Sequence, residues 1–337
     1  LQAIKLKLHN AEITVKDVQE KELTEYPPLP YSLDTLQVEA NKKYGYSPKI
    51  VLDTVQQLYE KKFVSYPRSD CNYIPEAQFE DAKKIFDILN VPGKDKANLA
   101  LKSKAWNDKK ITAHHAIIPT IVKVNDLDDT QQKIYNMIAK RYILQFFPPC
   151  TAEKTIFTLS VADEIFTGSG QIILEAGFKA LEEKETTDIN ILPKLKIGDK
   201  IDKGDYLIQE KKTTPPKRFT EGTLLAAMAN IYKYVDAKNP NREKLKEVKG
   251  IGTPATRDTI IAELQDTVSK GRDIEPCLKK VKKELVPTAF GINLIENIDK
   301  SLTYPDTTAE MEYKLAEIAE GKQSLQDFID TVINMSL

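Results

Sequence analysis

The pattern of apolar and polar positions divides the chain into strand-like stretches on either side of a helical block. Residues 3–15 alternate apolar and polar side chains, which predicts a half-buried strand. Residues 153–176 return to a period of two on both sides of Thr167-Gly-Ser-Gly170, which predicts a hairpin with its turn there. Because these stretches flank a helical block, we expect that block to be inserted into one β domain.

Within the block, capping residues precede stretches with helical spacing. Ser32 can cap one helix, and Ser47 followed by Pro48 gives the next helix an N-cap and a proline at its first position. Residues 63–65 follow as a short strand. Helix, tight turn, helix and strand are the outline of a winged helix-turn-helix. Two further amphipathic helices are predicted, at residues 75–89 and 130–146.

Prolines mark the breaks between these regions. Residues 26–31 (YPPLPY) favour a hinge between domains over a polyproline ligand for a partner protein. A second helical region follows Pro215 and Pro216, with helices expected at residues 221–234 and 255–264. This region has the outline of another helix-turn-helix.

Composition excludes several classes of protein. The 337 residues are 41% hydrophobic and 29% charged, a globular mixture, and no stretch approaches the roughly 20 apolar residues of a membrane span. The three cysteines, Cys71, Cys150 and Cys277, lie far apart, which argues against a disulfide scaffold or a zinc ribbon. Their scarcity fits a reducing compartment, so we expect a cytoplasmic protein. Because the chain opens with Leu1, we expect that an N-terminal portion has been removed.

Charge is unevenly distributed although the net charge is only −1. Residues 211–283 hold 17 Lys/Arg against 9 Asp/Glu, whereas residues 301–337 hold 2 against 7. A basic region beside an acidic one favours contact with phosphates. From charge alone, a solvated lysine-rich surface is the stronger explanation.

The most informative cluster is residues 65–70, Ser-Tyr-Pro-Arg-Ser-Asp. A phenol is a weak nucleophile, but the guanidinium of Arg68 could neutralise the oxygens of a phosphate under attack by Tyr66. A structural Tyr–Pro turn is the alternative. Among 14 tyrosines, spacing alone does not single out Tyr66.

Two of the three histidines, His114 and His115, are adjacent. Neighbours in a regular element face different ways, which argues against a two-histidine metal site. One ring could contact a phosphate while the other packs or faces solvent, and a purely structural histidine is the alternative.

Two other motifs have simpler explanations. Asp126-Leu-Asp128-Asp129 could hold magnesium, but it stands where carboxylates cap a helix. The GxGxxA at residues 250–255 follows a charged stretch where a dinucleotide-binding fold would need a buried strand.

Four segments in fixed order carry a family resemblance. They read LYEKKFVSYPRSD (58–70), AHHAIIPT (113–120), TPPKRFTEGTLL (214–225) and KGIGTPATR (249–257), with LVPT (285–288) and TAEME (308–312) extending the match. Together they resemble the type IA DNA topoisomerases, most closely the bacterial topoisomerase III branch. The resemblance spans nearly the whole chain.

The resemblance implies a multidomain α+β, toroidal enzyme with a β hinge domain and two helical domains that contain helix-turn-helix folds. We expect the hinge at residues 1–26 and 151–180, the tyrosine domain at 27–150, and most of the DNA-groove domain at 181–337. In the family, a Toprim domain N-terminal to these segments binds Mg²⁺ through an acidic cluster that this sequence lacks. We therefore expect Mg²⁺ in the full-length enzyme and no metal site in this chain.

By motif, the resemblance makes Tyr66 the nucleophile of a 5′-phosphotyrosyl link. It implies that Arg68 positions the tyrosine and the phosphate, and that His114 hydrogen-bonds a phosphate in the same site. The same resemblance implies that five residues contact DNA: Lys43, Arg218, Thr253, Thr256 and Arg257.

The implied activity is to cut one DNA strand, pass another, and reseal without ATP, since the phosphotyrosine link keeps the bond energy. Without a Toprim domain, we expect this chain to be nearly inactive. The expected partners are single-stranded DNA, a RecQ-type helicase and a single-strand-binding protein, and the expected state is a monomer at the bacterial nucleoid. One rival is a non-catalytic helix-turn-helix DNA-binding protein, in which Tyr-Pro-Arg has no purpose. The other is a tyrosine recombinase, whose tyrosine would lie near the C-terminus.

Overall fold

The computed structural model describes residues 2–9, 11–111, 113–181, 194–202, 204–239, 242–247, 250–269 and 272–336. These residues form an α+β structure that divides into two compact units. The sheet unit comprises residues 1–29, 89–105 and 140–216, and the helical unit comprises residues 30–88, 106–139 and 217–337. One border between them falls inside the proline-rich stretch 26–31.

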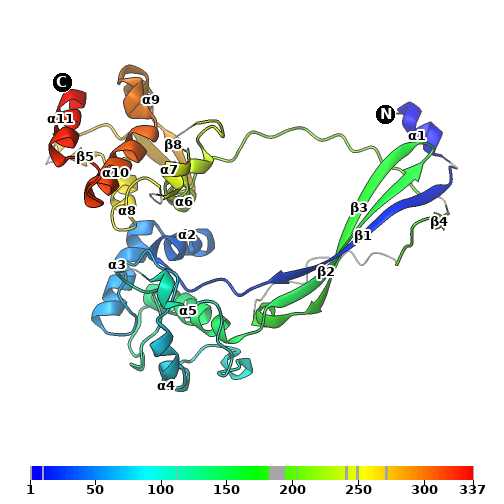
Figure 1. Cartoon of the computed structure of the whole chain (residues 1–337), viewed down its shortest axis with the longest axis horizontal. Coiled ribbons are helices and arrows are strands. Elements are labelled where there is room, and N and C mark those ends of the chain that lie inside the picture. The colour runs from blue at the N-terminus through cyan, green and yellow to red at the C-terminus, as the bar shows by residue number, and fades with distance from the viewer. Residues whose placement is uncertain are drawn as a thin grey trace. The chain divides into compact units, whose positions relative to one another are not determined.

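Antiparallel strands in the order β3-β2-β1-β4 form the sheet (Figure 1). They are β1 (Ile13–Glu25), β2 (Cys150–Val161), β3 (Glu164–Glu175) and β4 (Lys200–Ile201). β1 pairs with β2 from one end to the other, with Ile13 opposite Val161 and Glu25 opposite Cys150. The expectation that strands on both sides of the helical block belong to one β structure is confirmed.

The hairpin turn lies at Ala162 and Asp163, and the predicted turn at residues 167–170 was wrong. Both turn residues have positive φ, 47° and 66°, which is the conformation that a tight two-residue hairpin favours. Gly168 lies inside β3 opposite Phe157, where a Cβ would come within 2.6 Å of the phenyl ring. The glycine therefore permits close packing within the sheet.

The first predicted strand was also partly wrong, because its beginning forms the helix α1 (Gln2–Leu8). Leu8 is buried against Ile13 and Val161, whereas Leu6 is 78% exposed. Ile4 and Leu8 are four residues apart, a spacing that suits one face of a helix as well as alternate positions of a strand. Short 3₁₀ helices complete this unit, at Lys94–Lys96, Leu144–Phe146 and Gly177–Leu181.

The helical unit begins with the predicted pair of helices. Its first elements are α2 (Leu33–Tyr44), α3 (Pro48–Glu60), α4 (Ala82–Ile88), α5 (Asp129–Ile143) and 3₁₀ helices at Glu76–Asp81 and Asp108–Lys110. Both predicted caps are confirmed, since Ser32 Oγ accepts from the N–H of Thr35 and Ser47 Oγ from that of Ile50. The strand expected at residues 63–65 is reduced to one bridge, which joins Val64 to Pro119.

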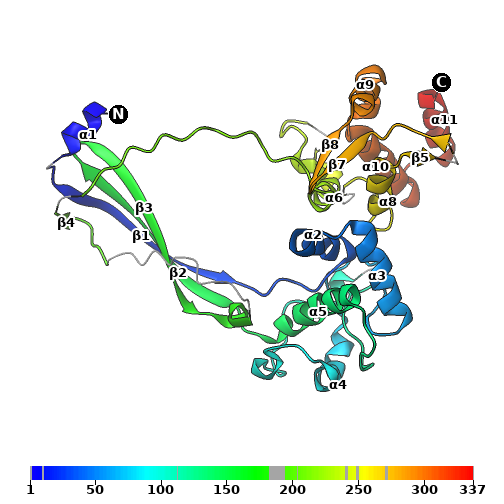
Figure 2. The same ribbon diagram turned by 180° about the vertical axis from the view of Figure 1, so that it is seen from behind.

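Residues 217–337 add small helices and hairpins to this unit. They are α6 (Glu221–Ala229), α7 (Arg242–Glu247), α8 (Arg257–Glu263), β5 (Val268–Ser269), β6 (Arg272–Asp273), β7 (Leu278–Val281), β8 (Glu284–Pro287), α9 (Ala289–Asn297), α10 (Asp306–Ala319), α11 (Leu325–Ser336) and 3₁₀ helices at Ile231–Lys233 and Lys300–Thr303. α2 packs against α6, and the views from both sides agree on this (Figure 2).

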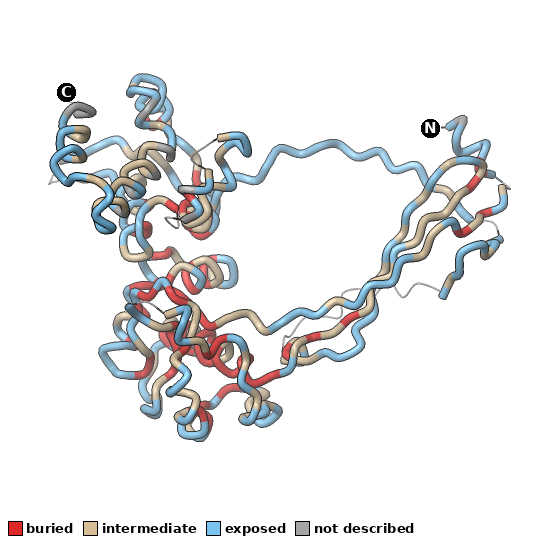
Figure 3. The backbone as a smooth tube through the Cα atoms, viewed as in Figure 1, coloured by how far each residue is buried: buried red, intermediate tan, exposed pale blue. Residues whose placement is uncertain are grey.

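Buried residues concentrate around α2, α3 and α5 (Figure 3). On α3, Val51, Val55 and Leu58 are fully buried. The loop that carries Tyr66 therefore starts from a well-packed helix. Among the described residues, no helix is long and apolar enough to cross a membrane.

Candidate active site and nucleic-acid surface

The loop that carries Tyr66 is paired with a second segment of the helical unit. After α3, the chain turns at Lys62, whose φ is 61°. The backbone N–H of Ser65 then donates to Ile118 O at 2.9 Å. Its Oγ donates to Ala116 O and accepts from the N–H of Ile118, again at 2.9 Å each. These bonds set residues 65–66 beside the segment that contains the two histidines.

The Tyr66 and His114 rings are stacked, with centroids 4.5 Å apart and planes inclined by 25°. Tyr59, on α3, presents its ring edge-on to Tyr66 at 5.8 Å. Sequence analysis did not select Tyr59, which carries no signal beyond lying in the same motif. Tyr66 is still 36% exposed, so a substrate can reach a side chain that two neighbouring rings hold in place.

Arg68 and His115 flank this stack in different ways. Arg68 is exposed, and within the described part of the chain its side chain makes no hydrogen bond or ion pair. An unpaired guanidinium so close in sequence to Tyr66 is suited to binding a phosphate. His115 is half-buried, with Nδ1 2.8 Å from Ala116 O and Nε2 3.3 Å from Gln78 Nε2. The two adjacent rings therefore make different contacts, and a phosphate contact by His114 stays a prediction.

The acidic residues at 128–129 make local contacts at the start of α5. Asp128 Oδ1 accepts from the N–H of Gln131 at 2.8 Å, and Asp129 pairs with Lys133 along α5. Across the described ranges, no three His, Cys, Asp or Glu side chains gather in a way that could hold a metal ion. The glycines at 250 and 252 are preceded by the helix α7, so the strand of a dinucleotide-binding fold is missing there.

The exposed members of the predicted DNA-binding set lie on separate elements. Lys43 is at the end of α2, with Nζ 5.1 Å from the centroid of the Tyr44 ring, and Arg218 precedes α6. Thr253 and Thr256 form a tight turn in which their hydroxyl oxygens are 3.1 Å apart. All four side chains are solvent-accessible, and their role in binding DNA stays a prediction.

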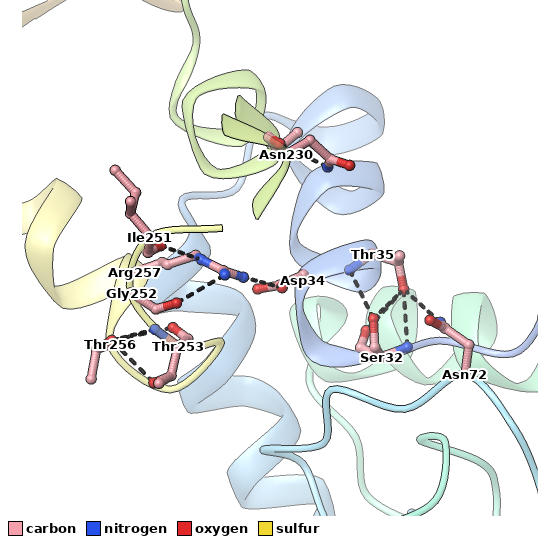
Figure 4. Close-up of polar contacts among 11 residues, drawn as sticks. Ser32, Asp34, Thr35, Asn72, Asn230, Ile251, Gly252, Thr253, Thr256 and Arg257 are labelled. Carbon is pink, nitrogen blue, oxygen red and sulfur yellow. Dashed lines mark hydrogen bonds and ion pairs between the residues drawn. The ribbon is translucent and has the colours of Figure 1, made fainter. Parts of the chain in front are cut away.

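Arg257, the fifth member, is only 2% exposed. Figure 4 shows its guanidinium between Asp34 and the carbonyl groups of Ile251 and Gly252. Its Nε donates to Ile251 O at 3.0 Å and its Nη2 to Gly252 O at 2.9 Å. Its Nη1 forms an ion pair with Asp34 Oδ2 at 2.5 Å. In this arrangement a phosphate cannot reach the guanidinium, so the structure gives no support to a direct DNA contact by Arg257.

Sequence analysis missed Asp34, which looks like an ordinary acid in the first turn of a helix. Burial raises the pKa of the Asp34 carboxyl above its usual range, and the positive charge of Arg257 opposes that rise. Asp70 and Asp258 add smaller upward contributions. A separation of 223 residues between Asp34 and Arg257 leaves no local signal for their pairing.

Comparison with known proteins places the chain in a family. The DNA topoisomerase family model matches residues 1–330 of the 337. The chain belongs to this family. Its relatives include DNA topoisomerase 3 of Vibrio cholerae, 37% identical over 338 residues that cover 97% of this chain and 51% of the relative. DNA topoisomerase 3 of Pasteurella multocida is 38% identical over 336 residues, 95% of this chain and 50% of the relative.

The resemblance to the topoisomerase III branch is therefore confirmed, and the chain spans about half the length of the curated relatives it matches. Full-length topoisomerase I from Thermotoga maritima has a similar structure, with a TM-score of 0.70 over 99% of this chain and 54% of that one. At 24% identity, this likeness concerns the fold alone.

Proposed function

We propose that this chain carries the strand-cutting tyrosine of a type IA topoisomerase of the topoisomerase III kind and acts on single-stranded DNA. The observation that supports this most is the stacking of His114 on Tyr66, close in the chain to the unpaired Arg68. The chain belongs to the topoisomerase family, and this supports the interpretation of Tyr66 as the residue that attacks a DNA phosphate. No observation favours the rival DNA-binding regulator.

In this proposal, Tyr66 Oη attacks the phosphorus of a DNA phosphodiester, and the bond from phosphorus to the 3′ oxygen breaks. A 5′-phosphotyrosyl link and a free 3′ hydroxyl result. Attack by that hydroxyl reverses the step and releases the phenol, so resealing needs no ATP. Arg68 neutralises charge on the non-bridging oxygens. His114 fixes the orientation of the Tyr66 ring and hydrogen-bonds a phosphate oxygen.

In this proposal, magnesium is bound by a part of the protein outside this chain. The described residues contain no cluster that fits a metal ion, so none of them is assigned to bind magnesium. As the family resemblance implies, we assign the ion and the group that accepts the phenolic proton to a Toprim domain of a longer protein. This chain alone should then bind single-stranded DNA and form little covalent adduct.

Four wider properties are proposed from the resemblance alone. They are a toroidal enclosure of the DNA strand by the longer protein, a monomeric state, cooperation with a RecQ-type helicase and a single-strand-binding protein, and a place at the bacterial nucleoid.

The test uses a 3′-labelled single-stranded oligonucleotide with Mg²⁺ and a denaturing gel, on which a covalent adduct migrates with the protein. Two proteins are compared: this chain, and the same chain extended upstream of Leu1 to the length of its relatives. We expect adduct from the longer protein only. In that protein, Tyr66→Phe should abolish the adduct and leave DNA binding intact, because only the nucleophilic oxygen is lost.

Tyr73→Phe is the matched control, since it removes a phenolic oxygen from the same loop outside the aromatic stack. That variant should keep the adduct. An adduct from the Tyr66→Phe protein would exclude Tyr66 as the nucleophile. Equal cleavage by this chain alone would show that no further domain is needed.

A further inference from the structure

In the described part of the helical unit, Asp34 and Asn41 of α2 make polar contacts with residues 217–337. The first is the ion pair of Asp34 with Arg257 (Figure 4). The second is centred on Asn41, whose Oδ1 accepts from Thr220 Oγ1 at 2.9 Å and from the N–H of Gly222 at 3.1 Å. In both contacts, a side chain of α2 crosses the boundary between α2 and residues 217–337 to reach its partner.

The apolar part of this boundary is small. Val38 of α2 packs against a buried cluster of three side chains, Leu225, Met228 and Ile261. The buried residues around α2, α3 and α5 form a far larger group. Polar contacts therefore act beside this apolar cluster in attaching α2 to residues 217–337.

The start of α2 is also bonded to the loop that carries Tyr66. The N–H of Leu33 donates to Ser69 O at 2.8 Å, and Ser69 is fully buried. Asn72 Nδ2 donates to Pro30 O at 2.7 Å, just ahead of the helix. The first turn of α2 and residues 66–72 are thus held together and would move together.

On the other side, Arg257 is bonded to its own loop. Nε and Nη2 donate to the carbonyl oxygens of Ile251 and Gly252, so these bonds persist whether or not Asp34 is present. The Nη1 contact crosses to α2. Separation of the boundary would break this contact, while the two bonds to Ile251 and Gly252 lie within the loop of Arg257 itself.

A buried ion pair suits a contact that has to open. Burial of two charges carries a large desolvation penalty, and both ions recover their hydration when they separate. An apolar pair of similar size would lose its contact on opening and would gain no favourable hydration in return. Asp34 Oδ1 is buried and has no hydrogen-bond partner in the described part of the chain, so hydration lost by this carboxylate is incompletely replaced.

We propose that Asp34 and Arg257 form a releasable latch that holds α2 and the Tyr66 loop against residues 217–337 and opens when a DNA strand passes between them. The latch rests on the proposed function, because strand passage is the event that requires this boundary to open. Its physical basis, an ion pair that sets the opening equilibrium of α2, can be tested without catalysis.

Amide hydrogen exchange of this chain is the first test, with α2 and α8 as the two reporters. Arg257→Met removes the positive charge and leaves the buried carboxylate of Asp34 without its counter-ion. We expect exchange in both helices to accelerate together, by about tenfold or more, as for the loss of one hydrogen bond between charged groups. Replacing both residues with apolar ones, Asp34→Leu with Arg257→Met, should return exchange to the original rate or below it.

Glu221→Gln is the matched control, because Glu221 is also a buried carboxylate and its partner, Lys280, lies on the same side of the boundary. This variant should leave exchange in α2 unchanged. If Arg257→Met accelerated α2 without α8, the pair would not control a common opening. Acceleration that extended to α5 would indicate general loss of stability, and either result would overturn the latch.

The second test uses the longer protein described above. The apolar double replacement should leave cleavage of a short oligonucleotide nearly unchanged and slow the relaxation of supercoiled plasmid, since only relaxation requires opening. Unchanged relaxation would overturn the latch. A longer protein that cleaves no DNA at all would instead refute the proposed function, and the exchange experiment would still decide whether Asp34 and Arg257 control the opening of α2.

Discussion

At the scale of single residues, burial distinguishes side chains of the same type that lie in similar sequence motifs. Arg68 and Arg257 both lie in segments typical of the family, two residues after a tyrosine and at the end of GIGTPATR. Arg68 is exposed and unpaired among the described residues, whereas Arg257 is buried against Asp34. The first can therefore meet a phosphate and the second supports the structure.

The contribution of Arg68 to cleavage can be measured in the longer protein. We expect Arg68→Ala to slow adduct formation by about 100–1,000-fold, the usual effect of losing one charge-stabilising donor, while Tyr66 still supports a slow reaction. Single-turnover cleavage of a labelled oligonucleotide measures this rate. Lys83→Ala, which removes an exposed cation on α4, should keep the original rate. An unaffected Arg68→Ala rate would remove Arg68 from the site.

Asp34 should make the stability of this chain depend on pH. Because burial raises the pKa of its carboxyl in the folded state, this group favours folding when protonated. Its contribution is fully present below the ordinary carboxyl pKa of 3.8 and is lost as the pH rises through the elevated folded value. Urea unfolding at a series of pH values measures the free energy of unfolding. Compared with the original chain, Asp34→Asn should lack this component, and identical pH profiles would contradict the raised pKa.

Whether a site residue could be predicted depends on how far apart in the sequence the interacting residues lie. Tyr66 and His114 belong to short motifs with family resemblance, so the sequence selected both and the structure brings them together. Asp34 depends on a partner 223 residues away, and Tyr59 depends on the angle at which α3 meets the loop. No local pattern encodes either contact, so both required the structure.

At the scale of elements, local chemistry predicted helix starts well and one turn badly. Ser32 and Ser47 cap the helices that the sequence assigned to them, because capping is a local hydrogen bond. Gly168 indicated a turn but lies inside β3, because a phenyl ring on the neighbouring strand leaves no space for a Cβ. A glycine required by a distant contact looks the same in sequence as one required by a turn.

Gly222 is a second glycine of this kind, on α6 against α2. A Cβ there would lie 2.6–2.9 Å from side-chain atoms of Asn41. Gly222→Ala improves helix propensity by about 1 kcal/mol, but we expect overpacking of about 1–3 kcal/mol to exceed that gain. Thermal unfolding should show a lower melting temperature. Gly204→Ala is the control, because its Cβ would come no closer than 3.2 Å to the flexible end of Ile13 and 3.8 Å to Tyr206. An equal effect there would contradict the explanation.

At the scale of the whole molecule, the sequence predicted the connection between distant segments, and the domain bounds expected from the family resemblance stay a prediction. The pairing of β1 with β2 follows from two period-two stretches around the helical block. The compact units, however, place residues 30–88 and 217–337 together, and contacts such as that of Asn41 with Thr220 account for this. Such contacts depend on tertiary packing, which an alternation of apolar and polar residues does not report.

The uneven charge gives a prediction for the chain as a whole. Residues 211–283 carry the excess of Lys/Arg, so phosphate contacts should dominate binding of single-stranded DNA. The logarithm of affinity should then fall with the logarithm of salt concentration, with a slope of about −0.7 for each phosphate neutralised. Fluorescence anisotropy of a labelled oligonucleotide at a series of salt concentrations measures this slope.

Replacement of single arginines then separates exposed from buried charge. Arg218→Ala should flatten the slope by about 0.7, because this exposed side chain can release one counterion equivalent on binding. Arg257→Met should leave the slope unchanged, since the buried guanidinium is neutralised by Asp34 and meets no phosphate. Equal flattening by the two replacements would show that DNA draws Arg257 away from Asp34. If neither replacement changed the slope, the phosphates would lie on another basic surface of the chain.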